Sequence, residues 1–427
     1  MDTSRRADRT AVRRWSGLIL TVALGALIAP SAASADAVTD WNTTMVEAQT
    51  IAKVSGPPAA RQGAIVEASV FDAANGIRPR FRAIHVRPSA PRFASRDAAA
   101  IAAAHEALLT LMPDQATLFN AQFAASLATL HGSRRSIDAG LRWGTRVADE
   151  ITAWRADDGS STILPPYVIG TAPGDWQPTP PAFVTTPAFR EAAVTQPFGL
   201  RSPSQFRPAG PPALTSRRYA AAFNEEKAFG SLTSTVRTPA QTQTALFWAS
   251  DGPGALWNRV ALQLLARHHV SLLGEARVLA LVNMAMCDGA IAVWDAKNFF
   301  NTWRPITAIR GATSDGNPAT SPDPTWEPLI TTPPFQEYPS GHAGVSSSAA
   351  NMLASFFGAR TSFTVVSPAF PGEARHFRSF SAATHDVADA RTFAGIHFRV
   401  ASNDAIGIGR NVARYLRRTM LRPRAHH

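Results

Sequence analysis

The chain has 427 residues but only one cysteine, Cys287, which excludes a disulfide within the chain. This cysteine follows the apolar residues Met284, Ala285 and Met286, so we expect a small buried side chain and not a nucleophile. Charged residues make up 17% of the chain and hydrophobic residues 45%. That balance is ordinary for a globular protein with one large core or two fused ones.

Clustered basic residues are also lacking, although the net charge is +11 at pH 7. The arginines are scattered, without a run of five or more and without interleaved aromatic residues, so we expect no nucleic-acid partner. Beyond the N-terminus no stretch offers about 18 uninterrupted apolar residues, so we expect no stable membrane insertion of the mature protein. The basic surface still favours anionic substrates.

The first 35 residues have the pattern of a secretory signal peptide. Five arginines precede an apolar run at residues 18–29, and the small residues at 33–35 form a cleavage site. We therefore expect cleavage before Asp36 and an exported protein, either periplasmic or secreted.

Alternating strand patterns are scarce, whereas alanine-rich amphipathic stretches recur along the chain, so we predict an all-α fold. The clearest stretch, 274–302, keeps one broad apolar face and should pack with 341–357 in a central bundle. The predicted helices are 40–53, 61–75, 96–112, 115–130, 136–156, 216–230, 238–250, 255–269, 274–302, 341–357, 384–396 and 403–419.

Two proline-rich segments interrupt the helices. Residues 158–212 contain twelve prolines and little periodicity, which is typical of a linker or of a segment that wraps around a site. Residues 312–339 form a second long loop, which should provide a wall of a pocket. We predict an N-terminal helical region at 36–235 and a C-terminal catalytic helical bundle at 236–427.

The most informative stretch is residues 338–342, Tyr-Pro-Ser-Gly-His. Upstream lies Lys297, with Arg304 and a proline beginning seven positions later, and downstream lies Arg391, with His397 six positions later. Three cations, two histidines, a hydroxyl and a glycine amide are the groups that a tetrahedral oxyanion needs around it.

Helical geometry allows these groups to meet. Lys297 and Arg304 are two turns apart on one face, and Pro305 disfavours helix at Arg304, so the guanidinium should emerge at the helix end. Gly341 should begin a helix, where its free N–H and the helix dipole favour an anion. Six residues on a straight helix would separate Arg391 and His397 by about 120°, so either the arginine side chain bridges that angle or the backbone bends near Gly395.

These three segments, in this order, resemble the vanadium-dependent haloperoxidases and the type 2 phosphatidic acid phosphatase superfamily that contains them. The resemblance covers about residues 240–410 and implies the helical bundle architecture of the vanadium haloperoxidase and acid phosphatase type. The neighbouring residues extend it: Trp294 and Phe335 occupy positions that line the halide side of the pocket in fungal chloroperoxidases, and Phe247-Trp248 with Asp251-Gly252-Pro253 is similar to a segment that supplies a supporting carboxylate.

The resemblance implies a vanadate cofactor bonded to a ring nitrogen of His397, with phosphate able to occupy the same site. It also implies that the oxyanion is held by the remaining groups, namely Lys297, Arg304, Ser340, Gly341 and Arg391. His342 is the implied acid and base, and Lys297 the group that polarises bound peroxide. Hydrogen peroxide and a halide or small organic molecule are the implied substrates.

Two positions depart from the family pattern. Ala390 stands where a serine usually precedes the arginine, and Ala401 stands where the phosphatases place an aspartate four residues after the last histidine. The carboxylate that orients His397 must then come from elsewhere, and we predict Asp251, with Asp404 in reserve. This loss favours a peroxidase over a phosphatase.

The function expected from the resemblance is vanadate-dependent oxidation of halide by hydrogen peroxide to hypohalous acid. Two alternatives use the same residues: an acid phosphatase that forms a phosphohistidine at His397, and an exported oxyanion-binding protein without turnover. Vanadate-dependent halogenation would separate the first from the others. The sequence leaves halide preference, organic substrate and oligomeric state open.

Overall fold

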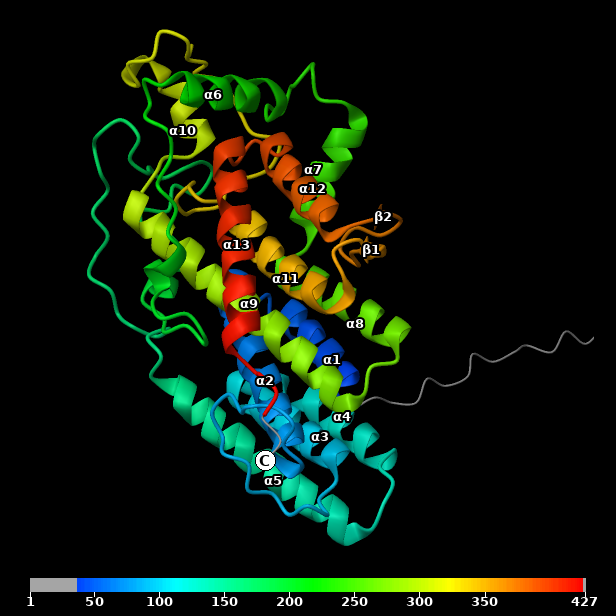
Figure 1. Ribbon diagram of the computed structural model, residues 1–427. Helices are drawn as coiled ribbons and strands as arrows, with labels where there is room; N and C mark the ends of the chain where they lie inside the picture. Colours follow the sequence, from blue (N-terminus) through cyan, green and yellow to red (C-terminus); the bar gives the residue numbers. More distant parts are fainter. Residues whose placement is uncertain (1–36, 425–427) are drawn as a thin grey trace, which may run out of the picture. The chain divides into compact units, whose positions relative to one another are not determined.

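The computed structural model describes residues 37–424, and the predicted signal peptide lies outside them (Figure 1). Within this range the chain forms thirteen α-helices and one small sheet. The helices are α1 (Thr39–Ile51), α2 (Gly56–Ile77), α3 (Arg96–Leu111), α4 (Ala116–Ala128), α5 (Arg134–Ala156), α6 (Arg217–Phe229), α7 (Pro239–Ser250), α8 (Pro253–His268), α9 (Leu272–Phe300), α10 (Pro305–Arg310), α11 (Gly341–Phe357), α12 (Phe380–Phe393) and α13 (Arg399–Thr419).

Short elements complete the chain. Strands β1 (Phe363–Val366) and β2 (Ala374–Phe377) pair antiparallel, with Phe363 opposite Phe377. Four short 3₁₀ helices lie in the loops: η1 (Pro113–Gln115), η2 (Arg190–Ala193), η3 (Pro203–Phe206) and η4 (Ala312–Ser314).

The predicted all-α fold is confirmed, and each of the twelve predicted stretches overlaps a helix. Helix α10 was not predicted because a six-residue helix is too short to show periodicity. The predicted end of the 384–396 helix is wrong, because Gly395 has a φ of 80°, which a right-handed helix does not allow. Helix α12 ends two residues before this glycine.

Helix α9 is the centre of the packing. It contacts α2 along one side and α11 and α13 along the other, and Figure 1 shows it running between these groups. Its length and hydropathy would suit a membrane span, but 94% of its most apolar window is buried inside the protein. The apolar face that the sequence indicates therefore belongs to a core helix. The predicted packing of this helix with the 341–357 helix is confirmed.

The proposed division at about residue 235 stays a prediction. Helices on either side of it pack together, since α2 lies along α9 and α6 contacts α12. The proline-rich segment 158–212 places Phe198 and Gly199 against α9, where their backbone N–H groups donate to Asp288 at 2.7 and 2.8 Å. The segment therefore wraps around the helices.

Helices α11 and α13 approach each other closely at a glycine. An added Cβ on Gly409 would lie 2.4 Å from the carbonyl oxygen of Gly344 and 2.6 Å from the backbone nitrogen of Ser348. Gly407, on the same helix, has nothing within 4 Å of an added Cβ. This close approach helps to position α11, which begins at Gly341, and α13, which follows His397.

We predict that Gly409→Ala lowers the free energy of unfolding by about 2–3 kcal/mol, because backbone atoms must shift to admit the methyl group. Gly407→Ala is the matched control, and it should stabilise the helix by about 0.5–1 kcal/mol through higher helix propensity. Denaturant unfolding of both variants provides the measurement. Equal effects of the two substitutions would contradict the close contact.

Candidate active site

The predicted site residues gather at one end of α9. They face a cavity of about 470 Å³, whose lining includes Trp294, Phe335, Gly341, His342, Arg391 and His397. The loop 312–339 provides part of its wall, as predicted from the sequence, through Pro333 and Phe335. Segments that are far apart in the chain thus form one polar centre.

Lys297 projects from the last turns of α9 and is fully buried. Its Nζ donates to the carbonyl oxygens of Gln336 at 2.6 Å and Glu337 at 3.0 Å. Burial lowers the pKa of Lys297 well below its ordinary value, and the charge of Arg304 lowers it further while Glu337 opposes the shift. Only a nearby anion would restore the usual stability of the ammonium form.

Arg304 lies between α9 and α10 with extended backbone geometry, as the following proline predicts. Its Nε donates to the Phe335 carbonyl at 2.6 Å and its Nη1 to the Ile396 carbonyl at 2.9 Å. Its Nη2 is buried without a hydrogen-bond partner in the described part of the chain. One edge of the guanidinium is fixed by the backbone, and the remaining donor is free for a ligand.

Arg391 is in the last turn of α12 and is only 2% exposed. Its Nη1 makes a long contact of 3.5 Å to the carbonyl of Trp248, and its Nε has no partner within residues 37–424. Gly395, just after α12, has a φ of 80°, so of the two alternatives for Arg391 and His397 the structure shows the bend of the backbone near Gly395.

Ser340 and Gly341 stand at the start of α11, as predicted. The Ser340 backbone N–H donates to Ala401 at 3.1 Å, while its buried hydroxyl neither caps the helix nor has another partner among the described residues. A Cβ on Gly341 would lie 3.1 Å from the Trp294 ring, so the glycine lets the helix start approach the indole. The N-terminus of this 17-residue helix faces the same cavity and favours an anion.

His397 is held by a carboxylate that the sequence reasoning missed. Its Nδ1 lies 3.0 Å from Oε1 of Glu337, and its Nε2 lies 3.2 Å from Nη1 of Arg304. A carboxylate beside Nδ1 and a donor beside Nε2 define the tautomer with the proton on Nδ1. The lone pair of Nε2 is therefore directed toward the cations.

Glu337 and His397 are both buried, and burial raises the pKa of Glu337 to about 7 against the opposing charges of Lys297 and Arg304. Burial and the three cations lower the pKa of His397 well below its ordinary value, so its imidazole is neutral near pH 7. The backbone N–H of His397 also donates to Glu226 at 3.2 Å.

The prediction that Asp251 or Asp404 orients His397 is wrong. Asp251 lines the cavity but pairs with Arg259 at 2.5 Å, and Asp404 accepts from the hydroxyl of Tyr338 at 2.7 Å. Glu337 was missed because it lies 60 residues before His397 and belongs to no helical pattern. Its position directly before the Tyr-Pro-Ser-Gly-His stretch was the only available signal.

His342 occupies the first turn of α11 and lines the cavity. Burial lowers its pKa well below the ordinary value, and the charges of Arg391, Lys297 and Arg304 act in the same direction. A neutral imidazole next to three cations is able to accept a proton and is not held as an imidazolium.

An aromatic wall stands next to the cations. The rings of Trp294 and Phe335 are 5.4 Å apart, and Lys297 and Arg304 lie over the Phe335 ring at 5.1 and 4.7 Å. The proline-rich segment adds Phe189, whose ring is 5.9 Å from Trp294, and this residue was not predicted. The wall makes one side of the cavity apolar, whereas the cations make the other side polar.

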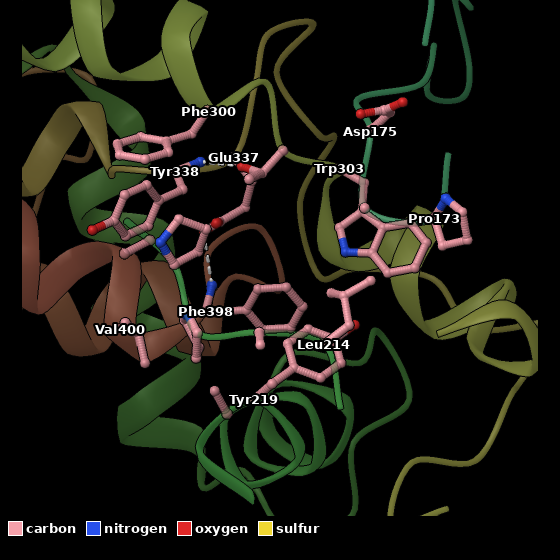
Figure 2. A pocket seen from close by; sticks show the side chains of 17 residues that line it. Pro173, Asp175, Leu214, Tyr219, Phe300, Trp303, Glu337, Tyr338, Phe398 and Val400 are labelled. Atoms are coloured by element: carbon pink, nitrogen blue, oxygen red, sulfur yellow. Dashed lines mark hydrogen bonds between the residues drawn. The ribbon is translucent and has the colours of Figure 1, made fainter. Parts of the chain in front are cut away.

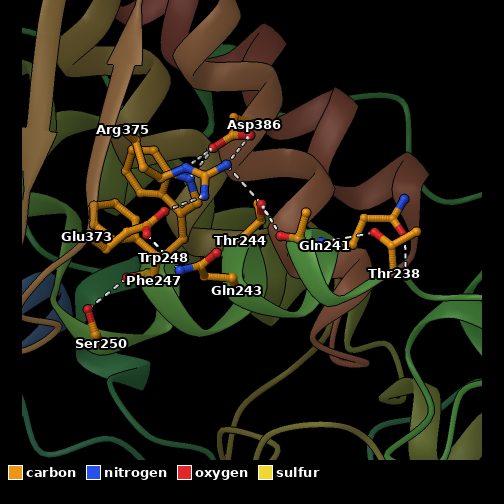
Figure 3. Close-up of polar contacts among 11 residues, drawn as sticks. Thr238, Gln241, Gln243, Thr244, Phe247, Trp248, Ser250, Glu373, Arg375 and Asp386 are labelled. Atoms are coloured by element: carbon orange, nitrogen blue, oxygen red, sulfur yellow. Dashed lines mark hydrogen bonds and ion pairs between the residues drawn. The ribbon is translucent and has the colours of Figure 1, made fainter.

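Trp248, Asp386 and Arg375 belong to a polar cluster (Figure 3). Trp248, whose carbonyl faces Arg391, donates from its indole nitrogen to Asp386 at 2.6 Å. Asp386 also accepts from Nε and Nη2 of Arg375 at 2.9 and 3.1 Å. Asp386, paired with Arg375, thus fixes the tryptophan whose carbonyl contacts Arg391.

The arrangement has the chemistry of an oxyanion site. The charges of three buried cations, Lys297, Arg304 and Arg391, all act on His342 and His397. Arg304, Ser340 and Arg391 each also have a buried donor without a partner among the described residues. Such donors suit several oxygens around one centre. Among residues 37–424 no group of three or more His, Cys, Asp or Glu side chains could hold a metal cation. The residues present therefore fit an oxyanion such as vanadate or phosphate.

Comparison with known proteins agrees with this geometry. Residues 277–424 match the family described as the VCPO second helical-bundle domain. Vanadium chloroperoxidase from Curvularia inaequalis is 32% identical over 185 residues, which cover 36% of this chain and 30% of that protein. The chain thus matches less than a third of the length of this relative.

Solved structures extend the likeness to most of the fold. The first bacterial vanadium-dependent iodoperoxidase superposes with a TM-score of 0.79 at 24% identity, covering 90% of this chain and 97% of that one. The holo-type bacterial vanadium-dependent chloroperoxidase gives a TM-score of 0.68 at 18% identity, covering 86% and 93%.

The fold is therefore that of the vanadium-dependent haloperoxidases, and the resemblance predicted from the sequence is confirmed. Within it, residues 277–424 correspond to the second helical-bundle domain, which carries Lys297, Arg304, His342, Arg391 and His397.

The cationic site predicts a pH-dependent affinity for tungstate, a tetrahedral oxyanion. Because burial lowers the pKa of Lys297 well below its ordinary value, its ammonium form is present at low pH and is lost as pH rises. Tungstate affinity should therefore fall with rising pH in calorimetric titrations. Lys297→Met should bind more weakly at low pH and show a flatter pH dependence, and an unchanged profile in this variant would contradict the role of Lys297.

The ion pair between Asp386 and Arg375, which helps to hold the Trp248 that contacts Arg391, is tested by Asp386→Asn. Loss of the carboxylate leaves the partly buried Arg375 without its main partner and should lower the free energy of unfolding by about 1–2 kcal/mol. Glu373→Gln, which removes a longer contact of 3.4 Å to the same arginine, is the control and should cost less. Thermal unfolding of the two variants compares them, and an equal or reversed order would disagree with the structure.

Proposed function

We propose that the protein is a vanadate-dependent peroxidase that oxidises halide with hydrogen peroxide to hypohalous acid. The observation that carries this proposal is the environment of His397, whose Nε2 faces three buried cations while Glu337 holds Nδ1 at 3.0 Å. The aromatic wall beside the cations and the likeness to vanadium haloperoxidases support it.

Vanadate would be held by His397 through Nε2 and by Lys297, Arg304 and Arg391 through their charge. Ser340 Oγ and the start of α11 at Gly341 would donate to its remaining oxygens. When bound, vanadate supplies a Lewis-acidic centre that activates hydrogen peroxide without a change in the redox state of the metal.

The protein's own contribution is rigid positioning and proton transfer. Backbone carbonyls fix Lys297 and Arg304 before any ligand arrives, so little reorganisation is needed when negative charge develops. Neutral His342 accepts a proton from incoming hydrogen peroxide and returns it when water leaves. In its ammonium form, Lys297 would place positive charge beside the oxygens of the bound group.

The halide would approach along the aromatic wall formed by Trp294, Phe335 and Phe189. These rings exclude water from one side of the cavity, which lowers the cost of placing a weakly hydrated anion beside the cations. The iodoperoxidase and chloroperoxidase relatives act on different halides by their names, so we propose no halide preference.

A phosphatase remains the second candidate. Phosphate has the shape and charge of vanadate, and Glu337 orients His397 as a phosphohistidine mechanism would require. The missing aspartate at position 401 therefore does not count against a phosphatase, because Glu337 supplies a carboxylate. The aromatic wall and the relatives favour the peroxidase.

Export remains part of the proposal. It rests on the pattern of residues 1–35. N-terminal sequencing of the protein recovered from a producing cell should begin at Asp36, and recovery of the intact N-terminus from the cytoplasm would contradict export.

The direct test reconstitutes the metal-free protein with orthovanadate and follows oxidation of iodide, bromide and chloride by hydrogen peroxide side by side. Oxidation of at least one halide that depends on vanadate supports the proposal. Hydrolysis of p-nitrophenyl phosphate by the metal-free protein, without vanadate-dependent oxidation, would establish the phosphatase instead. Oxyanion binding without either activity would support the remaining alternative, an oxyanion-binding protein without turnover.

The two histidines should separate binding from turnover. His342→Ala should keep vanadate but lose about 100-fold or more of halide oxidation, because acid–base catalysis contributes about that much. His397→Ala should lose the bond to vanadate and retain only loose binding by the three cations. Vanadate affinity and iodide oxidation are measured for each variant, and full oxidation in His342→Ala or wild-type affinity in His397→Ala would refute these roles.

A further inference from the structure

A second cavity, which Glu337 lines, is shown in Figure 2. It has a volume of about 310 Å³, and aromatic side chains dominate its walls: Tyr219, Phe300, Trp303, Tyr338 and Phe398. Prolines of two loop segments, including Pro173 and Pro211, complete the walls. The size and the rings suit one small planar molecule.

Two polar groups define what such a molecule must offer. Glu337 lines this cavity, and its Oε1 accepts from the backbone N–H of Phe398 at 3.1 Å as well as facing His397. Tyr219 is only 4% exposed, and its hydroxyl, which lies next to the Trp303 indole, donates to no acceptor in the described part of the chain. A buried O–H without an acceptor costs free energy that a bound ligand would recover.

The Tyr219 hydroxyl is a neutral donor under ordinary conditions. Burial raises its pKa above the usual value, and the charges of Asp315 and Glu337 raise it further while the Trp303 indole opposes the shift. Tyr219 and Glu337 both line this cavity. One ligand hydroxyl between them would accept a hydrogen bond from Tyr219 and donate one to Glu337.

The charges of the lining select against ions. No Lys, Arg or His side chain lines the cavity, so an anion would find no partner there. Two carboxylates line the cavity, but Glu337 already faces the charges of Lys297 and Arg304, and Asp175 already accepts from the backbone N–H of Ala172 at 2.9 Å, so an organic cation would gain little. A neutral aromatic molecule with one hydroxyl group satisfies the rings and both polar groups.

We propose that this cavity is a binding site for a small phenol, with its ring among the aromatic walls and its hydroxyl between Tyr219 and Glu337. The site is separate from the cavity that contains His342 and Arg391, so it is not the halide pocket. Its ligand contacts the carboxylate that orients His397. Phenol binding to the metal-free protein needs neither vanadate nor turnover, so its outcome is independent of the proposed peroxidase.

The experiment titrates phenol and anisole, which lacks the O–H donor, against metal-free protein by ligand-observed NMR. Phenol should bind with a dissociation constant on the order of 1 mM, and anisole at least about fivefold more weakly. Tyr219→Phe should weaken phenol binding about five- to tenfold, because it removes the donor to the ligand oxygen. This variant removes only an unpartnered hydroxyl, so folding should not suffer.

Two tryptophan variants locate the binding. Ala213→Trp, at an exposed alanine in the lining, should block the cavity and abolish phenol binding, whereas Ala182→Trp at an exposed loop alanine outside the lining should leave it unchanged. Equal affinities for phenol and anisole, no binding of phenol, or binding unaffected by Ala213→Trp would each overturn the proposal. Tighter binding of phenyltrimethylammonium than of phenol would overturn it in favour of an organic cation site.

Discussion

The burial of three cations around one histidine is the constraint on which the site depends. Lys297, Arg304 and Arg391 are each at most 2% exposed, and burial lowers the pKa of all three. Unpaired charges in a protein interior are costly. Glu337 and Glu226 are the carboxylates that oppose them, and burial raises the pKa of both. The site formed by these residues therefore has an excess of positive charge that an oxyanion would balance.

The fold holds these charges in place with backbone groups. Carbonyls at 335–337 and 396 accept from Lys297 and Arg304, so the loop before α11 and the bend after α12 set the positions of side chains from α9 and its C-terminal end. Arg391 depends on Trp248, which Asp386 fixes in turn. The unpartnered donors of Arg304, Ser340 and Arg391 are then available to a ligand. The side chains are held in this arrangement before the ligand binds.

The sequence predicted most of the fold because helical periodicity persists over long stretches, and it predicted Lys297, Arg304, His342, Arg391 and His397 because their spacing and order are distinctive. Glu337 and Phe189 could not be predicted in this way. Each acts through a contact with a residue more than 50 positions away, and each lies in a loop without periodicity. Asp251 was predicted because its segment is similar to one that supplies a supporting carboxylate in the family. That similarity does not establish which carboxylate reaches the imidazole of His397, and Glu337 was therefore missed.

The central claim is that one oxyanion occupies the space between His397 and the three cations. A crystal structure of the protein soaked with orthovanadate tests it most directly. We predict density bonded to Nε2 of His397 and within hydrogen-bond distance of Lys297, Arg304, Ser340 and Arg391, with Glu337 still on Nδ1. Vanadate bound elsewhere, or a fully loaded protein in which His397 makes no bond to it, would contradict the account.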